Sequence, residues 1–438
     1  MDTLTVGLLV AGVLIVLLLM GMPVAFALGA VSVVFLLWFD GLGSMLVLAD
    51  TLFGGLDEFA LLSIPMFILM GAAIASSRAG GDLYEALERW LYKVPGGLLI
   101  SNLGACSIFA ALSGSSPATC AAIGKMGIPE MKKRGYPDGL ACGAIAAGGT
   151  LGILIPPSIT MIVYGIATEV SIGRLFIAGI IPGLMLTALF MAWSLYYAGK
   201  KGFRFKIGDL GYTWRQKFEI LPRILPFLLI IALVLWALYG GVATPSEAAG
   251  VGALFAIVLV VLIYRMWNPK AWWEILRSAT RESVMIMLII GTSALFSYMM
   301  SSLFITQSLA QWIAGLDVSS WVLMLYVNLF LLVAGLFLPP VAVILMTAPT
   351  LVPIVVAQGF DPIWFGVMLT INMEIGLITP PVGLNLYVIN GIAPDVKLPT
   401  ILWGALPFML CMVVGIILLM FFPGIATWLP DALMGIAT

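Results

Sequence analysis

Apolar residues occupy most of the chain in long runs, and short polar segments separate these runs. The first run, residues 4–39, would be about 54 Å long as one helix, whereas the hydrocarbon core of a bilayer is about 30 Å thick. Gly21 and Pro23 therefore predict a break that leaves two helices, residues 4–20 and 23–39. Later runs predict further helices at residues 59–77, 175–197, 225–240, 246–264, 283–300 and 401–422. This pattern predicts an all-α polytopic membrane protein.

The polar segments between these runs differ in charge. Residues 82–93 alternate charged and apolar positions at helical spacing, which is typical of an interfacial helix, with a solvated connector helix as the alternative. Residues 200–223 contain seven Lys and Arg and predict a polar linker that divides the chain into two halves. Residues 40–57 contain Asp but neither Lys nor Arg and predict a loop. Residues 265–281 form a basic amphipathic segment with three tryptophans suited to the membrane interface: Trp267, Trp272 and Trp273.

A Pro-Pro pair interrupts an apolar run twice, and the second occurrence repeats the first. The chain reads Gly-Thr-Leu-Gly-Ile-Leu-Ile-Pro-Pro-Ser over residues 149–158 and Glu-Ile-Gly-Leu-Ile-Thr-Pro-Pro-Val-Gly over residues 374–383. A constant offset of 224 residues superposes Gly152 on Gly376, Pro156 on Pro380, Pro157 on Pro381, Pro129 on Pro353 and Gly135 on Gly359. A register held over this length indicates two structural repeats.

Each Pro-Pro pair predicts an interrupted helix. Proline lacks an N–H and forces the preceding residue out of the α region, so several carbonyls lose their helical partners. In lipid these carbonyls must be satisfied inside the protein. The half-helices are expected at residues 138–151 and 158–168, and again at 363–377 and 382–392. Paired interrupted helices in two halves of a chain indicate the substrate and ion sites of a transporter.

Two further apolar segments predict re-entrant hairpins. Residues 96–128 are interrupted by Ser-Gly-Ser-Ser-Pro at 113–117, which leaves two arms too short to span separately. Residues 321–355 bend around residues 335–340. Basic residues flank the first hairpin, whereas residues 301–320 and 358–362 beside the second contain no Lys or Arg. The two hairpins are therefore expected to enter the membrane from opposite faces.

The charge distribution predicts the topology. The arrangement places all of the 20 Lys and Arg except Arg174 on one face, which is the positive-inside pattern. Two inverted-topology repeats follow, with both termini on the outer side of the membrane. A parallel duplication would instead put the uncharged flanks of the second hairpin on the cytoplasmic face. No basic residue precedes the first span, which argues against a cleavable signal peptide.

The chain is expected to divide into scaffold and transport parts. The scaffold comprises residues 1–94 with an interfacial arm, residues 174–281 with the linker and a second arm, the connector 282–320 and the final helix 397–438. The transport parts are residues 95–173 and 321–396, each with one hairpin and one interrupted helix.

Composition excludes several function classes. The chain is 62% hydrophobic and 9% charged with a mean hydropathy of +1.15, far outside the range of soluble domains. It contains no histidine, and its four cysteines, Cys106, Cys120, Cys142 and Cys411, lack metal or redox spacing, so we expect no enzyme. A net charge of −1 argues against nucleic acid as a partner.

Several motifs resemble the large membrane subunit of tripartite ATP-independent periplasmic (TRAP) transporters, across essentially the whole chain. The motifs are Gly-Met-Pro-Val-Ala-Phe-Ala-Leu-Gly at 21–29, Leu-Ser-Gly-Ser-Ser at 112–116, Gly-Gly-Thr-Leu-Gly-Ile-Leu-Ile-Pro-Pro-Ser at 148–158, Ala-Thr-Pro-Ser-Glu-Ala-Ala at 243–249 and Gly-Leu-Ile-Thr-Pro-Pro-Val-Gly-Leu-Asn at 376–385. The resemblance implies a sodium-coupled importer of an organic anion, commonly a carboxylate. It also implies a small four-helix membrane subunit and a periplasmic binding protein as partners, and an elevator fold similar to that of divalent-anion/sodium symporters.

The resemblance also implies site residues. A first Na⁺ site maps to Ser113, Ser115, Gly152, Ile155 and Pro157, and a second to Gly335, Gly376, Thr379 and Val382. The substrate is expected between the hairpin tips, near Ser116, Thr150 and Asn385. The chemistry of the breaks agrees, because Na⁺ prefers oxygen ligands and the N-terminus of a half-helix favours a carboxylate. The alternative for each Gly and Ser is close helix packing.

Glu374 is a carboxylate inside a membrane segment, which makes it a functional candidate. It is expected to hold a proton, to tune the second cation site or to bond a neighbouring helix, with a water-exposed position as the alternative.

Competing functions leave different signatures. An ATP-driven permease needs a nucleotide-binding subunit in trans, and the chain has no Gly-x-x-x-x-Gly-Lys-Ser/Thr motif. A channel would conduct without a binding protein, and a stand-alone symporter would transport without partners. An enzyme would need a base beside the serines of residues 113–116, and the sequence supplies none there. The binding protein is expected to select the substrate, so this chain does not identify it.

Overall fold

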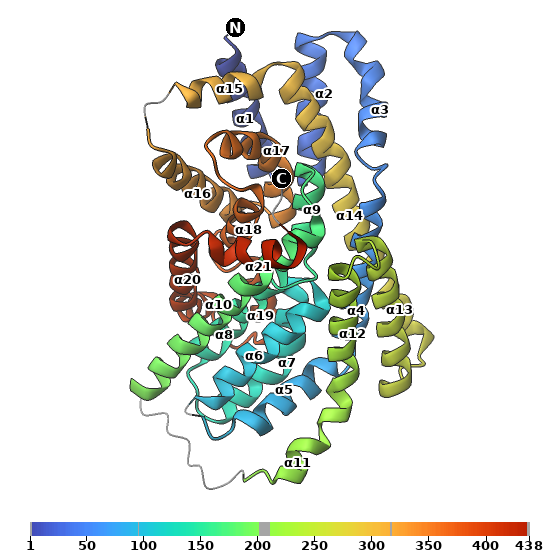
Figure 1. Cartoon of the computed structure of the whole chain (residues 1–438), viewed down its shortest axis with the longest axis vertical. Coiled ribbons are helices and arrows are strands. Elements are labelled where there is room, and N and C mark those ends of the chain that lie inside the picture. The colour runs from blue at the N-terminus through green and yellow to red at the C-terminus, as the bar shows by residue number, and fades with distance from the viewer. Residues whose placement is uncertain (1, 95, 201–210, 316–317, 436–438) are drawn as a thin grey trace.

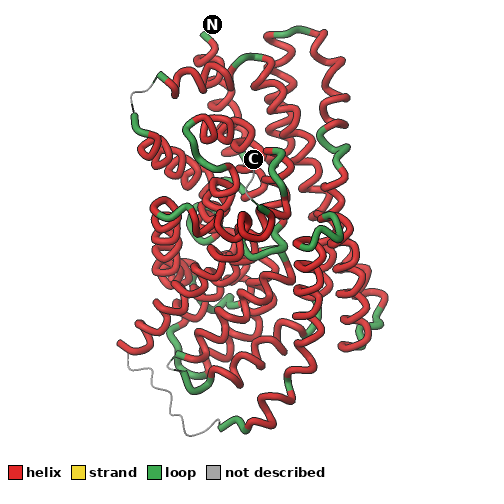
Figure 2. Tube along the Cα trace, viewed as in Figure 1, coloured by secondary structure: helices red, strands yellow, loops and turns green. Residues whose placement is uncertain are grey.

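The computed structural model describes residues 2–94, 96–200, 211–315 and 318–435, and every regular element in these ranges is helical (Figure 2). The α-helices are α1 (Thr3–Leu19), α2 (Val24–Phe39), α3 (Met45–Gly54), α4 (Ser63–Ala75), α5 (Ala79–Leu91), α6 (Gly97–Ser113), α7 (Ser116–Lys133), α8 (Asp138–Thr150), α9 (Ile159–Thr168), α10 (Ile172–Lys200), α11 (Trp214–Glu219), α12 (Leu221–Tyr239), α13 (Pro245–Tyr264), α14 (Pro269–Ser302), α15 (Ile305–Ala314), α16 (Ser320–Phe337), α17 (Pro340–Ala357), α18 (Pro362–Leu377), α19 (Leu384–Ile392), α20 (Leu398–Phe421) and α21 (Gly424–Met434). The 3-10 helices are η1 (Leu42–Ser44), η2 (Phe59–Leu62) and η3 (Leu151–Ile153).

Seven of the described helices are long and apolar enough to cross a membrane, and the bent pair Leu42–Gly54 and Phe59–Ala75 would make an eighth span. The predicted all-α polytopic class is therefore confirmed. The first predicted break also lies where expected, because α1 ends before Gly21 and Pro23 precedes α2. Gly21 has a φ of 84°, in the left-handed region that glycine adopts without strain.

The two predicted repeats are present as two sets of helices with matching bounds. The hairpins are α6–α7 and α16–α17; α7 and α17 begin at Ser116 and Pro340, 224 residues apart, and end at Lys133 and Ala357, again 224 apart. The interrupted helices are α8–α9 and α18–α19, and both breaks contain a cis peptide bond between the two prolines. The 224-residue offset found in the sequence therefore also relates the helices of the two repeats in the structure.

The hairpins lie in opposite halves of the molecule (Figure 1). Helices α6 and α7 occupy the half that also holds α11, whereas α16 and α17 occupy the half that holds the N-terminus. Helix α8 packs on α7 and α20, and α16 packs on α18. Helix α4 packs on α13 and α14 and also contacts the first hairpin. This opposed arrangement agrees with the predicted inversion.

Some predicted boundaries were wrong. Residues 40–57 are not a loop throughout, because α3 forms there; its apolar residues Leu46 and Phe53 are exposed on a helix that carries Asp50 among them. The flank 301–320 contains α15, and α21 follows the last predicted helix. The predicted linker contains α11 and the start of α12, while residues 201–210 lie outside the described part of the chain.

The basic segment 265–281 and the predicted helix 283–300 are not separate elements. Residues 269–281 of the segment and the whole predicted helix belong to α14, a single helix of 34 residues, and residues 265–268 precede it. No glycine or proline stands between them, so the charged residue Glu282 is accommodated inside the helix rather than ending it. The division expected between residues 281 and 282 thus falls within one rigid element.

Candidate transport site

The tip of the first hairpin gathers hydroxyl and carbonyl oxygens. Helix α6 ends at Ser113, Gly114 takes the left-handed conformation, and α7 begins at Ser116. The Ser113 Oγ lies 2.8 Å from the Thr119 Oγ1, which donates to the Ser115 carbonyl at 2.9 Å. The Ser113 Oγ also lies 3.3 Å from the same carbonyl. Three oxygens of different residues therefore form one cluster, of the donor type that Na⁺ prefers.

The first helix break packs directly on this tip. A β-carbon added at Gly152 would lie 2.8 Å from the Ser115 carbonyl oxygen, and one added at Gly114 would lie 2.8 Å from the Pro157 carbonyl oxygen. Ser113, Ser115, Gly152 and Pro157 are thus brought together. The side chain of Ile155 packs instead near Gly183 of α10. Only glycine at 152 allows the backbones of break and tip to come this close.

The second break packs on the second hairpin in the same way. A β-carbon at Gly376 would lie 2.2 Å from the Gly335 carbonyl oxygen. The Val382 N–H donates to the Leu336 carbonyl at 3.2 Å. The Thr379 hydroxyl donates to the Ile375 carbonyl of its own helix at 2.6 Å, which leaves its oxygen lone pairs available to a cation. The structure therefore groups Gly335, Gly376 and Val382 and places Thr379 on the adjoining turn.

The two breaks differ in exposure. Pro156 and Pro157 are buried, whereas Pro380 and Pro381 are exposed and Val382 is 37% exposed. The first break, which includes η3, is enclosed by α6, α7 and α10, while the second opens at the surface of the chain.

The three substrate candidates are buried and two of them join the halves. The Asn385 Nδ2 donates to the Ser116 Oγ at 2.7 Å and to the Ala146 carbonyl at 3.0 Å. The Thr150 hydroxyl donates to Ala147 of its own helix. Ser116, Thr150 and Asn385 do not line the cavity described below, so their contact with a substrate remains a prediction.

Glu374 is fully buried in α18, and neither carboxylate oxygen has a hydrogen-bond partner in the described part of the chain. The water-exposed alternative therefore does not describe this structure, and no hydrogen bond ties Glu374 to a neighbouring described helix. Residues two apart on a helix point about 200° apart, so Glu374 faces away from the side on which Gly376 meets Gly335.

An ion pair joins the base of the first hairpin to the second repeat. The Lys132 ammonium pairs with Asp395, which lies between α19 and α20, and lies 3.8 Å from Asp138 at the start of α8. The hydrogen bond from Lys132 holds the pKa of Asp395 below its usual value. This bridge brings the cytoplasmic ends predicted for both repeats together.

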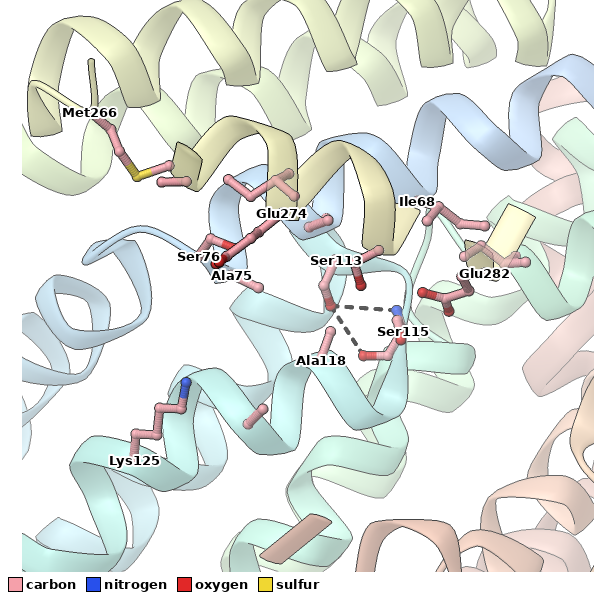
Figure 3. Close-up of a pocket in the computed structure, with 17 residues that line it drawn as sticks. Ile68, Ala75, Ser76, Ser113, Ser115, Ala118, Lys125, Met266, Glu274 and Glu282 are labelled. Carbon is pink, nitrogen blue, oxygen red and sulfur yellow. Dashed lines mark hydrogen bonds between the residues drawn. The ribbon is translucent and has the colours of Figure 1, made fainter. Parts of the chain in front are cut away.

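A cavity of about 460 Å³ lies between the first hairpin, α4 and α14 (Figure 3). Ser113 and Ser115 of the hairpin tip line one end, and Lys125 of α7 and Met266 line the wall farther from the tip. Small residues of α4 and its C-cap line another wall: Gly71, Ala72, Ala75 and Ser76. The cavity thus extends from the oxygen cluster to Lys125 and Met266.

Three charged side chains line this cavity. Lys125 comes from the hairpin, and Glu274 and Glu282 come from α14. Sequence reasoning missed all three and also Thr119. The signal for Glu282 was a carboxylate at the edge of an apolar run, directly after the basic segment, and for Thr119 a hydroxyl four residues after Ser115. Which helices face each other across the cavity could be learned only from the fold.

The fold and these paired breaks define a multi-pass transport protein built from two inverted repeats. The family model described as "Tripartite ATP-independent periplasmic transporter, DctM component" matches residues 11–425. The chain therefore belongs to the family of TRAP transporter large permease proteins, and the predicted resemblance is confirmed.

Characterised relatives align over nearly the full chain. The C4-dicarboxylate TRAP transporter large permease protein of Pseudomonas aeruginosa is 38% identical over 88% of this chain and 89% of its own. The corresponding protein of Rhodobacter capsulatus is 35% identical, covering 98% and 99%. The sialic acid TRAP transporter large permease protein of Vibrio cholerae is 32% identical, covering 96% and 97%. These relatives are named as permeases, which confirms that the chain is not an enzyme.

A solved structure shares the fold. The crystal structure of the Alcanivorax borkumensis YdaH transporter superposes with a TM-score of 0.66 at 16% identity, covering 94% of this chain and 99% of that one. At this identity the likeness concerns the fold alone.

Proposed function

We propose that this chain imports a small organic anion across the inner membrane, driven by Na⁺, by an elevator movement of the two hairpins and two interrupted helices. The observation that carries the proposal is the contact of each break with a hairpin tip, at Gly152 with Ser115 and at Gly376 with Gly335. Each contact holds backbone and hydroxyl oxygens at a helix interruption, where a membrane protein can bind a cation without protein carboxylates.

The residues present fit Na⁺ as the coupling ion. The first site would use the hydroxyls of Ser113 and Thr119 and the Ser115 carbonyl, with backbone from Gly152, Ile155 and Pro157. The second would use Gly335, Gly376, Thr379 and Val382. No group of three or more His, Cys, Asp or Glu in the described chain is arranged to hold a metal ion, so these oxygens are the cation donors on which the proposal rests.

The substrate proposal is an organic acid delivered by a periplasmic binding protein. Relatives are named for C4-dicarboxylate, sialic acid and ectoine. Similar permeases are thus named for chemically different substrates, which supports selection of the substrate by the binding protein. The substrate would lie between the hairpins, near Ser116, Thr150 and Asn385.

A small membrane subunit would complete the complex. The scaffold helices α1, α2, α12 and α13 expose large apolar side chains, including Leu8, Phe26, Trp236 and Leu254, each at least 60% exposed. Residues 95–173 and 321–396 would move against the remaining scaffold. Both termini would be periplasmic.

Reconstitution tests the proposal. Proteoliposomes containing this chain, its small subunit and the binding protein should accumulate radiolabelled succinate, or sialic acid or ectoine tested in parallel, only with an inward Na⁺ gradient. Liposomes with this chain alone should show little uptake. Strong Na⁺-driven uptake by the isolated chain would favour a stand-alone symporter, and conductance without saturation would favour a channel.

A further inference from the structure

The cavity at the first hairpin carries a charge arrangement that the ion and substrate sites do not use. Lys125 lines the cavity on α7, and it forms no ion pair within 4 Å in the described part of the chain. Figure 3 shows its ammonium turned toward the cavity. Lys125 is exposed in this structure, so its charge is hydrated here.

Glu282 stands at a different level of the same cavity. It belongs to α14, between Arg281 and the apolar run that begins at Val284, and it is half-buried. No ion pair within 4 Å involves it among the described residues. Figure 3 places Glu282 toward the Ser115 end of the view and Lys125 at the far end. Ser115 and Lys125 are ten residues apart, or about 15 Å along α7.

The proposed elevator movement would change this relation. For the tip to reach the outer face, the hairpin must move tip-first along its own axis. Lys125 would then leave the mouth of the cavity and enter the depth now occupied by the tip. An unpaired lysine at membrane depth is costly, and a carboxylate beside it removes much of that cost.

We propose that Glu282 is the partner that receives Lys125 when the hairpin moves outward, so that the two residues pair in the outward-facing state and separate in the state seen here. A movement of about two helical turns, together with the reach of the lysine side chain, brings the ammonium to the carboxylate. Glu282 is thus a positioning residue for the transport cycle. This inference rests on the proposed elevator function.

The wall between them suits such movement. A β-carbon at Gly71 of α4 would lie 2.5 Å from the Ser113 carbonyl oxygen, and one at Gly80 would lie 3.2 Å from the Ala122 Cβ. At these two points the hairpin meets α4 and α5 through small residues. Elsewhere Leu87 of α5 packs on Gly104 of α6, and Arg134 pairs with Glu88 of α5, so the movement would have to release these contacts or carry α5 with the hairpin.

Paired substitutions test the inference in the reconstituted complex, with radiolabelled succinate as the probe and sialic acid and ectoine in parallel. Glu282→Gln should lower the initial uptake rate about tenfold or more, because Lys125 then lacks its partner. The double variant Lys125→Met with Glu282→Gln should recover to within about threefold of the unaltered complex. Lys133→Met and Glu58→Gln, the same changes at exposed positions, should have little effect.

A second measurement does not depend on uptake. Cysteines introduced at positions 125 and 282 should cross-link with Hg²⁺ in the membrane, whereas cysteines at 133 and 282 and each single variant should not. If the unaltered complex transports but Glu282→Gln is unchanged and no cross-link forms, the inference is wrong and the proposed function stands. If the unaltered complex does not transport, the proposed function fails, and the cross-link alone decides whether the two residues meet.

Discussion

The amide nitrogen of Asn385 donates a 2.7 Å hydrogen bond to the hydroxyl of Ser116, and this bond joins the start of α19 in the second repeat to the start of α7 in the first. The same amide nitrogen reaches the Ala146 carbonyl of α8. A single side chain therefore links the second interrupted helix to both the first hairpin and the first interrupted helix.

Replacing Asn385 should loosen this junction. Asn385→Ala removes both bonds and leaves a buried hydroxyl and a carbonyl with fewer partners, at a cost of about 1–3 kcal/mol. Ser116→Ala should cost less, because the Asn385 amide keeps its bond to Ala146. Thermal unfolding in detergent should give that order, with Asn390→Ala as a control, since Asn390 bonds only to Val396 close by in sequence. Equal destabilisation by Asn385→Ala and Asn390→Ala would contradict the linking role.

A methyl group at Gly376 should damage the second break. Its β-carbon would overlap the Gly335 carbonyl, so α18 and α16 would have to separate, at a cost of about 1–3 kcal/mol. We expect Gly376→Ala to reduce uptake and to weaken Na⁺ activation. Gly391→Ala in α19 is the matched control, because nothing lies within 4 Å of a β-carbon there. Equal uptake by the two variants would show that transport does not need the close approach of Gly376 to Gly335.

The oxygen cluster at the first tip should set the Na⁺ requirement. Thr119→Val and Ser113→Ala each remove one oxygen donor and leave a buried cation one ligand short. Thr379→Val should act in the same direction at the second site. Uptake measured against Na⁺ concentration should shift to higher Na⁺ in all three, with the proteins still inserted. Unchanged Na⁺ dependence in Ser113→Ala and Thr379→Val would exclude both from the ion sites.

Labelling should reveal the orientation in the membrane. A cysteine at Lys132 should be protected from a membrane-impermeant reagent added outside, and a cysteine at Gln358 should be labelled, because these residues lie at the bases of the two opposed hairpins. Labelling in intact cells and in inverted vesicles gives the comparison. The reversed pattern, with position 132 labelled and position 358 protected, would contradict the predicted orientation of the protein in the membrane.

The helix breaks were predictable from sequence because proline acts locally. Single prolines such as Pro129 and Pro353 lie inside helices α7 and α17, but each Pro-Pro pair interrupts its helix. The 224-residue offset then relates the second hairpin to the first. The continuity of α14 was not predictable in the same way. A charged residue such as Glu282 marks the edge of an apolar run in a hydropathy profile, yet it costs a helix little where its side chain lines a cavity.

Tertiary contacts account for the rest of what sequence reasoning missed. Thr119 joins the tip cluster because α7 turns its hydroxyl back onto the Ser115 carbonyl. Lys125 becomes a functional candidate only because α7 and α14, far apart in sequence, line the same cavity. The packing of α4 against the tip through Gly71 likewise involves no local signal.

Helix α14 is about 51 Å long, so its basic end and its apolar end must tilt as one lever. A rotation of about 10° would displace one end by about 9 Å relative to the other. Because spanning helices tilt when bilayer thickness changes, the lipid environment would act directly on the wall that carries Glu274 and Glu282. A change in the thickness of the surrounding membrane would therefore affect the transport cycle of this protein.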